Sequence, residues 1–221
     1  PNIPRYRIVN TSVDNGQTLT RTYYGNGLEN TRTDSAGSAT TDEYNHQGLI
    51  TKQTGPVTGA VQTYSYNLVG NIVSSTNAGG TTAYTYDAAN QLVKLTEPGG
   101  SCPATGNPAA NSGCLIFEYD QNAQETKRIL PGGATIVTAR DASGRPTRIT
   151  GKSGAGATSV DIGYSYTPTG GTGDRTTIQS RTAYAEQGIT AGAVTNYSYD
   201  TRNRLTLAQE KVGSTGTASW A

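Results

Sequence analysis

Short stretches in which aromatic and small polar residues alternate recur along the chain. The clearest copies are residues 64–72, 84–92 and 197–205, which read YSYNLVGNI, YTYDAANQL and YSYDTRNRL. Tyr-x-Tyr places both rings on one face of a β-strand, because successive side chains point to opposite faces. The next residue is Asp or Asn, whose side-chain oxygen can bond the backbone two residues on and start a turn. Gly or Asn three residues later suits the positive φ of a bulged hairpin turn, and Leu or Ile then begins the return strand.

Weaker copies keep the same frame. Residues 44–50 lack the first Tyr, residues 117–120 have Phe in its place, and residues 140–145 lack both aromatics. Residues 164–167 lead into a glycine-rich turn, and residues 23–28 are a degenerate copy. The second aromatic position falls at residues 24, 44, 66, 86, 119, 140, 166 and 199. The base period is therefore about 20 to 22 residues, with insertions before the copies at 119, 166 and 199.

The repeat predicts an all-β fold of repeated antiparallel β-hairpins. One hairpin is marginally stable in water, so we expect the hairpins to lie edge to edge, with tyrosines of neighbouring copies packed in ladders. Stability is then spread over contacts between adjacent copies, and the core is a one-sided stripe of Tyr, Leu, Ile and Val. We expect residues 1–221 to be a single repeat segment with about seven or eight degenerate copies, interrupted by a loop insertion at residues 101–114.

Composition narrows the alternatives. The formal net charge is +1 and charged residues make up 15% of the chain, which gives no electrostatic footprint for nucleic acid or an anionic membrane. No stretch reaches the roughly 18 apolar residues of a membrane helix. Hydrophobic residues are only 33%, but the 14 tyrosines argue against disorder, which is typical of chains poor in aromatics. The sequence does not begin with Met and shows no signal peptide, so we expect a piece of a longer protein.

The frame Tyr-x-Tyr-Asp-x-x-Gly/Asn-x-Leu at this period resembles the YD repeat of the Rhs/YD-repeat superfamily, from about Arg21 to Leu205. Members include bacterial Rhs and contact-dependent toxins, wall-associated YD proteins, the shell proteins of insecticidal toxin complexes, and the teneurins. The resemblance implies a curved or spiralling β-sheet that forms part of a hollow shell. In toxin members the shell encloses a C-terminal toxin, and in teneurins it carries an adhesive surface.

Two features depart from the family pattern. Large shells contain many more copies than this chain does. The autoproteolytic motif of many toxin members includes Asp-Pro, and no Asp-Pro occurs here. The resemblance therefore carries over a structural role only, at Tyr64, Tyr66, Gly70, Tyr84, Tyr86, Asp87, Tyr119, Asp120, Tyr164, Tyr166, Tyr197, Tyr199 and Asp200.

The two cysteines, Cys102 and Cys114, bracket a segment rich in Gly, Pro and Asn. A disulfide closing this loop would contribute about 3 kcal/mol in the chain-entropy model, on condition that the compartment is oxidising. The alternative is two free thiols, and a redox site is disfavoured because the pair lacks C-x-x-C spacing. We expect a disulfide and an extracellular or cell-surface location.

Other candidate chemistry has a structural explanation. His46 is the one histidine and is expected to be a solvated turn residue. With two cysteines it falls short of the about four ligands of a zinc site. Asp87, Asp120, Asp141 and Asp200 recur at the turn position, which indicates a structural role.

Three acidic residues and two glycine-rich segments remain. Asp42, Glu43 and Glu118 are expected to face solvent from strands. The segments 151–156 and 169–173 are expected to be loops, because the first lacks the earlier glycine of a phosphate-binding P-loop.

The sequence therefore predicts a non-catalytic scaffold of a secreted or surface bacterial protein, forming part of a β-shell that encapsulates or presents a toxin or other domain. We expect no catalytic residues, no cofactor and no metal. The alternative is a carbohydrate- or cell-surface-binding adhesive module, since rows of Tyr with Thr, Asn and Gln can bind sugars. An enzyme is the least favoured class. Expected partners are the rest of the parent chain, an enclosed toxin domain, or glycans and cell-surface proteins, without nucleic acid or membrane insertion. Free sheet edges also favour self-association.

Overall fold

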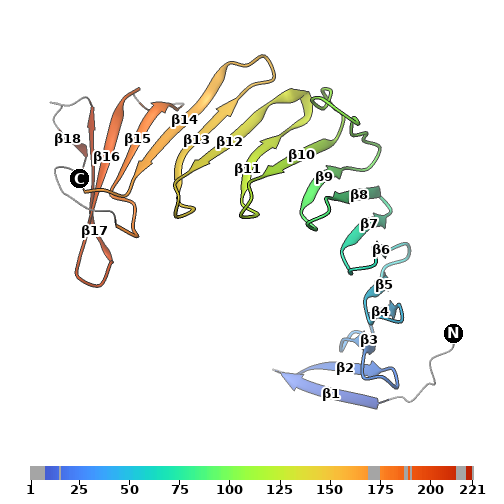
Figure 1. The fold of residues 1–221 in the computed structure, drawn as a ribbon. Coiled ribbons are helices and arrows are strands. Elements are labelled where there is room, and N and C mark those ends of the chain that lie inside the picture. The colour runs from blue at the N-terminus through green and yellow to red at the C-terminus, as the bar shows by residue number, and fades with distance from the viewer. Residues whose placement is uncertain are drawn as a thin grey trace. The chain divides into compact units, whose positions relative to one another are not determined.

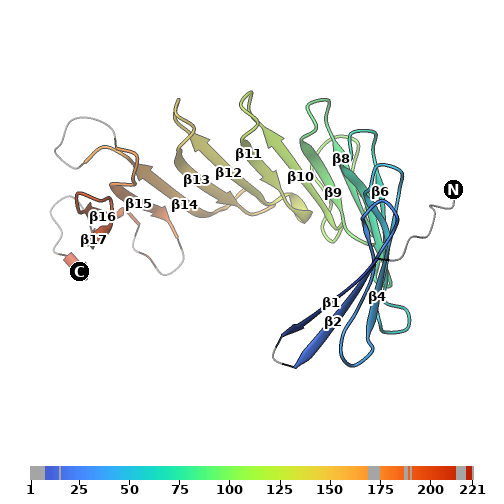
Figure 2. The ribbon, with the colours of Figure 1, turned by 90° about the horizontal axis from the view of Figure 1, so that it is seen from below.

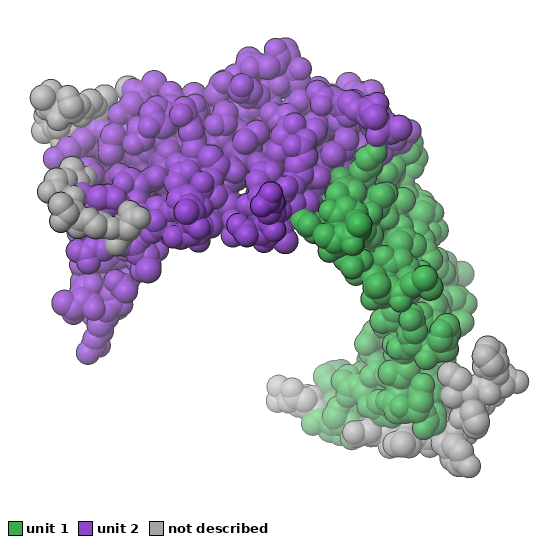
Figure 3. All heavy atoms as spheres, in the orientation of Figure 1, with its two compact units in different colours: residues 1–100 green, residues 101–221 purple. Residues whose placement is uncertain are grey.

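The computed structural model describes residues 8–14, 16–168, 175–186, 189, 191–212 and 218–220. Apart from one short 3-10 turn, η1 (Pro131–Gly133), their regular structure consists of β-strands (Figure 1). The chain forms two compact units, residues 1–100 and 101–221 (Figure 3). The all-β prediction is confirmed.

Each unit is an antiparallel meander in which every strand pairs with the next strand along the chain. The strands of the first unit are β1 (Ile8–Asp14), β2 (Gln17–Tyr23), β3 (Glu29–Thr33), β4 (Ala39–Tyr44), β5 (Ile50–Thr54), β6 (Val61–Tyr66), β7 (Ile72–Asn77), β8 (Gly80–Tyr86) and β9 (Leu92–Thr96).

The second unit follows the same plan. Its strands are β10 (Cys114–Tyr119), β11 (Glu125–Ile129), β12 (Thr135–Arg140), β13 (Pro146–Lys152), β14 (Thr158–Ser165), β15 (Ser180–Ala185), β16 (Ala193–Tyr199), β17 (Leu205–Val212) and β18 (Ala218–Trp220). Figure 2 shows strands β10 to β14 of this unit side by side in chain order.

The second aromatic residue of each copy marks a fixed point in the register. The pairing shifts by one residue just before Tyr44, Tyr66, Tyr86, Tyr119 and Tyr199. Such a bulge places two residues of one strand opposite one of its partner and increases the local twist. The hairpin prediction, including the bulge, is confirmed in these copies.

The first copy corrects the sequence frame by one residue. The pairing shift lies before Tyr23, which pairs with Glu29. Tyr23 therefore occupies the second aromatic position, and Tyr24 stands at the turn position that Asp87 holds elsewhere. The frame placed Tyr24 at the aromatic position because two adjacent tyrosines fit it equally well in sequence.

The tyrosines of the repeat frame lie on one face of the strands, and the sheet has little interior. In β8, Tyr84 and Tyr86 are half-buried while Thr85 between them is exposed. The buried apolar residues of the described chain include Cys114, Ile129, Tyr166, Ala183 and Ala193. Stabilisation therefore comes mainly from strand pairing and from side chains that cover their neighbours on the same face.

Asp42 contradicts the prediction that it faces solvent. Its side chain is buried, with 4% of the residue exposed, and its Oδ1 accepts a hydrogen bond from Gln53 Nε2 at 2.9 Å. Asp42 stands two residues before Tyr44, at the first aromatic position of this copy. Side chains two residues apart point to the same face of a strand, so Asp42 lies on the tyrosine face. Glu43 and Glu118, on the opposite face, are exposed as predicted and pair with lysines.

Candidate functional site

The turn of each copy is a small hydrogen-bonded motif built around the Asp or Asn residue. In the copy at residue 87, the Asp87 N–H donates to the Gln91 carbonyl at 3.0 Å, and the Asn90 N–H donates to the Asp87 carbonyl at 3.1 Å. Asp87 Oδ1 accepts from the N–H groups of Ala89 and Gln91, both at 2.9 Å. Asn90 has a φ of 63°, so it adopts the left-handed conformation that the frame predicted.

The same bonds recur wherever the turn residue is Asp or Asn. Two backbone N–H groups, two and four residues on, donate to the side-chain oxygen of Asn45, Asn67, Asp120, Asp141 and Asp200. The fourth turn residue has a positive φ in each, as in Gly70 with 91°. These side chains therefore build the turns of their copies.

The frame missed one turn of the same type. The Asp34 side chain accepts hydrogen bonds from the N–H groups of Ala36 and Ser38, and Gly37 has a φ of 83°. This turn joins β3 to β4 and thus links successive copies. Its Asp-x-x-Gly spacing could have predicted the turn, but the frame was defined by tyrosines before the turn residue, and this turn has none.

Arginines reinforce two of the turns in the second unit. Arg145 Nε lies 2.7 Å from Asp141 Oδ2, and Arg204 Nε lies 2.7 Å from Asp200 Oδ2. The Arg145 side chain is the main cause that lowers the pKa of Asp141. The pKa of Asp200 is also lowered, first by the backbone N–H of Arg204 and then by its guanidinium.

The second tyrosine of a copy bonds to the preceding copy. The Tyr66 hydroxyl donates to the Ile50 carbonyl at 2.6 Å, and the Tyr86 hydroxyl donates to the Ile72 carbonyl at 2.9 Å. In the second unit, Tyr166 bonds in the same way to Pro146 at 3.0 Å. We call this series the tyrosine ladder, and burial raises the pKa of Tyr66, Tyr86 and Tyr166.

A fourth bond joins Tyr199 to the segment before β15. The Tyr199 hydroxyl donates to the Ile178 carbonyl at 2.7 Å. The acceptors in the other copies begin the return strand of the previous copy, as Ile50 and Ile72 do in β5 and β7. Each ladder hydroxyl therefore satisfies a main-chain carbonyl and ties one element to another.

The remaining tyrosines of the frame lie close to this ladder. Tyr64, Tyr84, Tyr164 and Tyr197 occupy the first aromatic position, and all are half-buried. Burial raises the pKa of Tyr197. Tyr119 is half-buried at the second position, opposite Glu125.

Cys102 and Cys114 form a disulfide that closes the segment between β9 and β10. Cys114 is fully buried, and Pro108 within the loop is buried too. The Gly132 N–H, in the turn between β11 and β12, is shared between the carbonyls of Pro108 and Ala109 at 3.2 and 3.1 Å. The loop is therefore fixed at its base by the disulfide and near its middle by the turn at η1.

The turn at η1 also contacts the next turn of the second unit. A Cβ added at Gly154 would clash with the Gly132 carbonyl oxygen. Gly154 lies in the turn between β13 and β14, within the segment 151–156 whose first two residues belong to β13. Gly154 therefore allows the two turns to pack closely, and its presence is explained without a phosphate-binding site.

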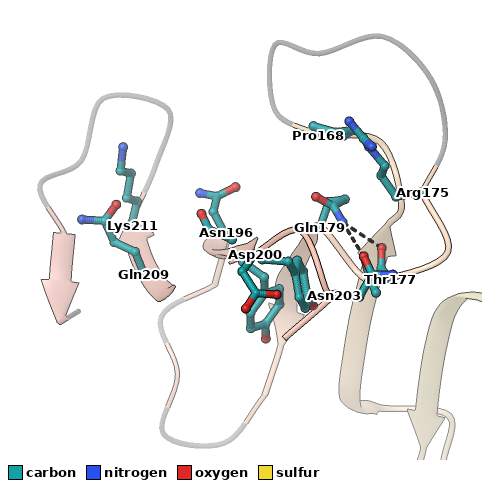
Figure 4. Close-up of a pocket in the computed structure, with 12 residues that line it drawn as sticks. Pro168, Arg175, Thr177, Gln179, Asn196, Asp200, Asn203, Gln209 and Lys211 are labelled. Atoms are coloured by element: carbon teal, nitrogen blue, oxygen red, sulfur yellow. Dashed lines mark hydrogen bonds between the residues drawn. The ribbon is translucent and has the colours of Figure 1, made fainter. Parts of the chain in front are cut away.

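A polar pocket of about 550 Å³ lies beside β16 and β17 (Figure 4). Its lining includes four amide side chains (Gln179, Asn196, Asn203 and Gln209) and the cationic residues Arg175 and Lys211. The glycine-rich segment 169–173 lies outside the described residues.

Among the residues that the structure describes, no cluster of three or more His, Cys, Asp or Glu side chains could hold a metal ion. His46 is exposed in the turn after β4, as predicted. In the same described residues, no helix has the length and apolar character needed to cross a membrane.

Comparison with protein families identifies the class of repeat. The RHS repeat model matches residues 44–82 and 66–101, and these residues hold the turns at Asn45, Asn67 and Asp87 and the ladder bonds of Tyr66 and Tyr86. Residues 44–101 are thus RHS repeats. The resemblance to the Rhs/YD-repeat superfamily, which the tyrosine frame indicated, is confirmed for these residues.

Solved structures and curated proteins were also compared. The chain is similar to the structure titled TcdB2-TccC3-TEV, with 12% identity and a TM-score of 0.47, over 88% of this chain and 11% of that one. It is also similar to a chain of the Photorhabdus luminescens Tc holotoxin pore with the mutation TccC3-D651A, with 13% identity and a TM-score of 0.41, over 92% of this chain and 16% of that one. This chain therefore spans about a tenth to a sixth of the length of these structures. No curated protein matches it.

Proposed function

We propose that this chain is a structural segment of a secreted or surface-exposed bacterial protein, in which Rhs hairpins form part of a β-shell that encloses or presents a toxin or another domain. The observation that carries this proposal is the tyrosine ladder. Because Tyr66 and Tyr86 each bond to the preceding copy, the number of copies can grow without a new kind of contact, as in other repeat proteins.

Three further features support the proposal. The side chains that recur from copy to copy are used to build turns and to join copies, which is the chemistry of a scaffold. The disulfide between Cys102 and Cys114 fits an oxidising compartment, such as the cell exterior. One of the similar solved structures is titled as a Tc holotoxin pore, and this printed name suggests a toxin as the partner to test first.

Limited proteolysis of the complete parent protein tests enclosure. If a shell surrounds another domain, that domain resists a broad-specificity protease in the intact protein and is cleaved quickly when expressed alone. Substituting both Tyr66 and Tyr86 by Phe should open the wall and raise the cleavage rate, whereas Tyr64→Phe and Tyr84→Phe, which remove hydroxyls outside the ladder, serve as the matched control. Equal cleavage of the domain in both contexts would contradict the proposal.

Assays on the chain itself separate a scaffold from an enzyme. We expect no hydrolase, transferase or nuclease turnover that a single point substitution abolishes. Light scattering of the isolated chain tests a related expectation, namely that its sheet edges lead to oligomers. A stable monomer would count against that association.

A further inference from the structure

The polar pocket beside β16 and β17 has a firm framework on one side. The Gln179 N–H donates to the Ser165 carbonyl at 2.8 Å, and the Gln179 carbonyl accepts from the Tyr197 N–H at 2.9 Å. Residue 179 therefore bridges the end of β14 and the middle of β16. The Tyr199 hydroxyl holds the adjacent Ile178 carbonyl at 2.7 Å, so this wall of the pocket is tied to the repeat scaffold at three points.

Amide and hydroxyl groups from separate elements line the pocket. Figure 4 shows Gln209 on β17, Asn196 on β16, and Gln179 with Thr177 on the segment before β15. The Gln179 amide is already oriented, because its Nε2 donates to the Thr177 carbonyl at 3.1 Å and to Thr177 Oγ1 at 2.8 Å. Amides offer both donors and acceptors, which suits a ligand with several hydroxyl groups.

The charge of the pocket is positive. Its carboxylate, Asp200, is engaged by Arg204 and by two backbone N–H groups. Arg175 and Lys211 also line the pocket and are exposed. Within the described part of the chain, neither cation has a carboxylate partner.

We propose that this pocket binds an acidic saccharide. The amides of Gln179, Asn196 and Gln209 pair with sugar hydroxyls, and Arg175 and Lys211, which lie at opposite ends of the pocket in Figure 4, pair with carboxylates of different rings. Charge-assisted bonds to a carboxylate are stronger than neutral ones, so the cations select for acid and the amides select for a polyhydroxylated ring. A volume of about 550 Å³ lies within the range of ligand sites, roughly 300–1,000 Å³.

The proposal is independent of the shell function. Saccharide binding requires only the elements from β14 to β17, and it holds whether or not the parent protein encloses a domain. Failure of the binding test would leave the scaffold proposal intact, and failure of the proteolysis test would leave the pocket intact.

Calorimetric titration of the 221-residue chain tests the pocket. The probes are a short oligogalacturonate, which carries a carboxylate on each ring, and a maltooligosaccharide of equal length, which carries none. We expect the acidic probe to bind and the neutral probe to bind roughly tenfold or more weakly, the difference that one charge-assisted bond makes.

Variants locate the binding. Lys211→Gln and Arg175→Gln should each weaken the acidic probe roughly tenfold, and Gln209→Ala should weaken both probes. Lys152→Gln is the matched control, because Lys152 is an exposed lysine of the same unit outside the pocket. Equal affinity for the two probes, no binding of either, or an equal effect of the Lys152 and Lys211 substitutions would overturn the proposal.

Discussion

The phenolic hydroxyl of Tyr86 donates a hydrogen bond of 2.9 Å to the main-chain carbonyl of Ile72 in the preceding copy. Ile72 is itself paired with Tyr66, the tyrosine at the equivalent position of that copy. The bonds of Tyr66, Tyr86 and Tyr166 therefore reach the residue that pairs at the bulge of the previous hairpin. The recurring tyrosine therefore covers the sheet with its ring and links copies with its hydroxyl.

Removing one ladder hydroxyl should destabilise the fold. We expect Tyr86→Phe to lower the free energy of unfolding by about 1 kcal/mol, because the Ile72 carbonyl loses a half-buried donor. Urea unfolding followed by circular dichroism measures this. Tyr84→Phe is the matched control within the same strand and should have a smaller effect. Equal losses in the two variants would show that the hydrogen bond to the Ile72 carbonyl adds nothing to the effect of removing a phenolic hydroxyl.

At the fourth turn position, two substitutions are expected to change the stability of the chain in opposite directions. Ala123 has a φ of 62°, a conformation that costs an L-residue with a Cβ about 1–2 kcal/mol. Ala123→Gly should therefore stabilise the chain by about 1 kcal/mol, whereas Gly70→Ala, at a φ of 91°, should destabilise it by a similar amount. Thermal unfolding of both variants checks the prediction, and a destabilising Ala123→Gly would contradict it.

The buried tyrosines predict a loss of stability in alkali. The pKa values of Tyr66, Tyr86 and Tyr166 are raised, with burial as the main cause. The folded chain thus retains protons that the unfolded chain releases, so this stabilisation is complete below the ordinary tyrosine pKa of about 10 and is lost as the pH rises above it. The urea concentration at the midpoint of unfolding should fall as the pH is raised from about 8 to about 11. In a variant with Tyr66, Tyr86 and Tyr166 all replaced by Phe, the midpoint should fall less steeply with pH. An unchanged slope would contradict the assignment of the alkaline loss to these tyrosines.

Asp141 predicts a loss of stability in acid. Its pKa is lowered mainly by the hydrogen bond from Arg145, so the stabilisation is present above the ordinary aspartate pKa of about 4 and is lost as the pH falls through the lower folded value. Asp141→Asn keeps a turn acceptor but removes the ion pair, and should flatten the acid limb of stability against pH. Asp87→Asn is the control, because Gln91 stands where Asp141 has its arginine. A larger effect in the control would refute the role of the ion pair.

The disulfide should stabilise both its own loop and the neighbouring turn. Replacing Cys102 and Cys114 by Ser should lower the free energy of unfolding by about 3 kcal/mol. Because the Gly132 N–H donates to the Pro108 and Ala109 carbonyls, its hydrogen exchange should accelerate in the same variant. A second preparation is the wild-type chain, reduced with a dithiol under denaturing conditions and refolded in the reduced state. It should show the same loss of stability and the same faster exchange as the Ser variant. Unchanged exchange at Gly132 would show that the loop docks without the disulfide.

Much of the local structure could be predicted from the spacing of a few residue types. Tyr84, Tyr86, Asp87 and Asn90 specify a face, a turn and a positive φ within seven residues, and each of these is a short-range property of the backbone. The frame failed where neighbouring residues were equivalent in sequence, as with Tyr23 and Tyr24. It also failed at Asp42, where a polar residue occupies a position whose burial is set by the face of the strand.

The sequence by itself determined the class of fold, because a period-two pattern closed by Asp and Gly at fixed offsets has one low-energy solution, the bulged hairpin. Only the tertiary structure decided what joins the hairpins and where other groups gather. The bond from Tyr66 to Ile50, the contact of the Pro108 loop with Gly132, and the pocket that Gln179, Asn196 and Lys211 line all link residues 15 or more positions apart. Such contacts depend on the register and twist of the paired strands, which no single copy of the repeat specifies.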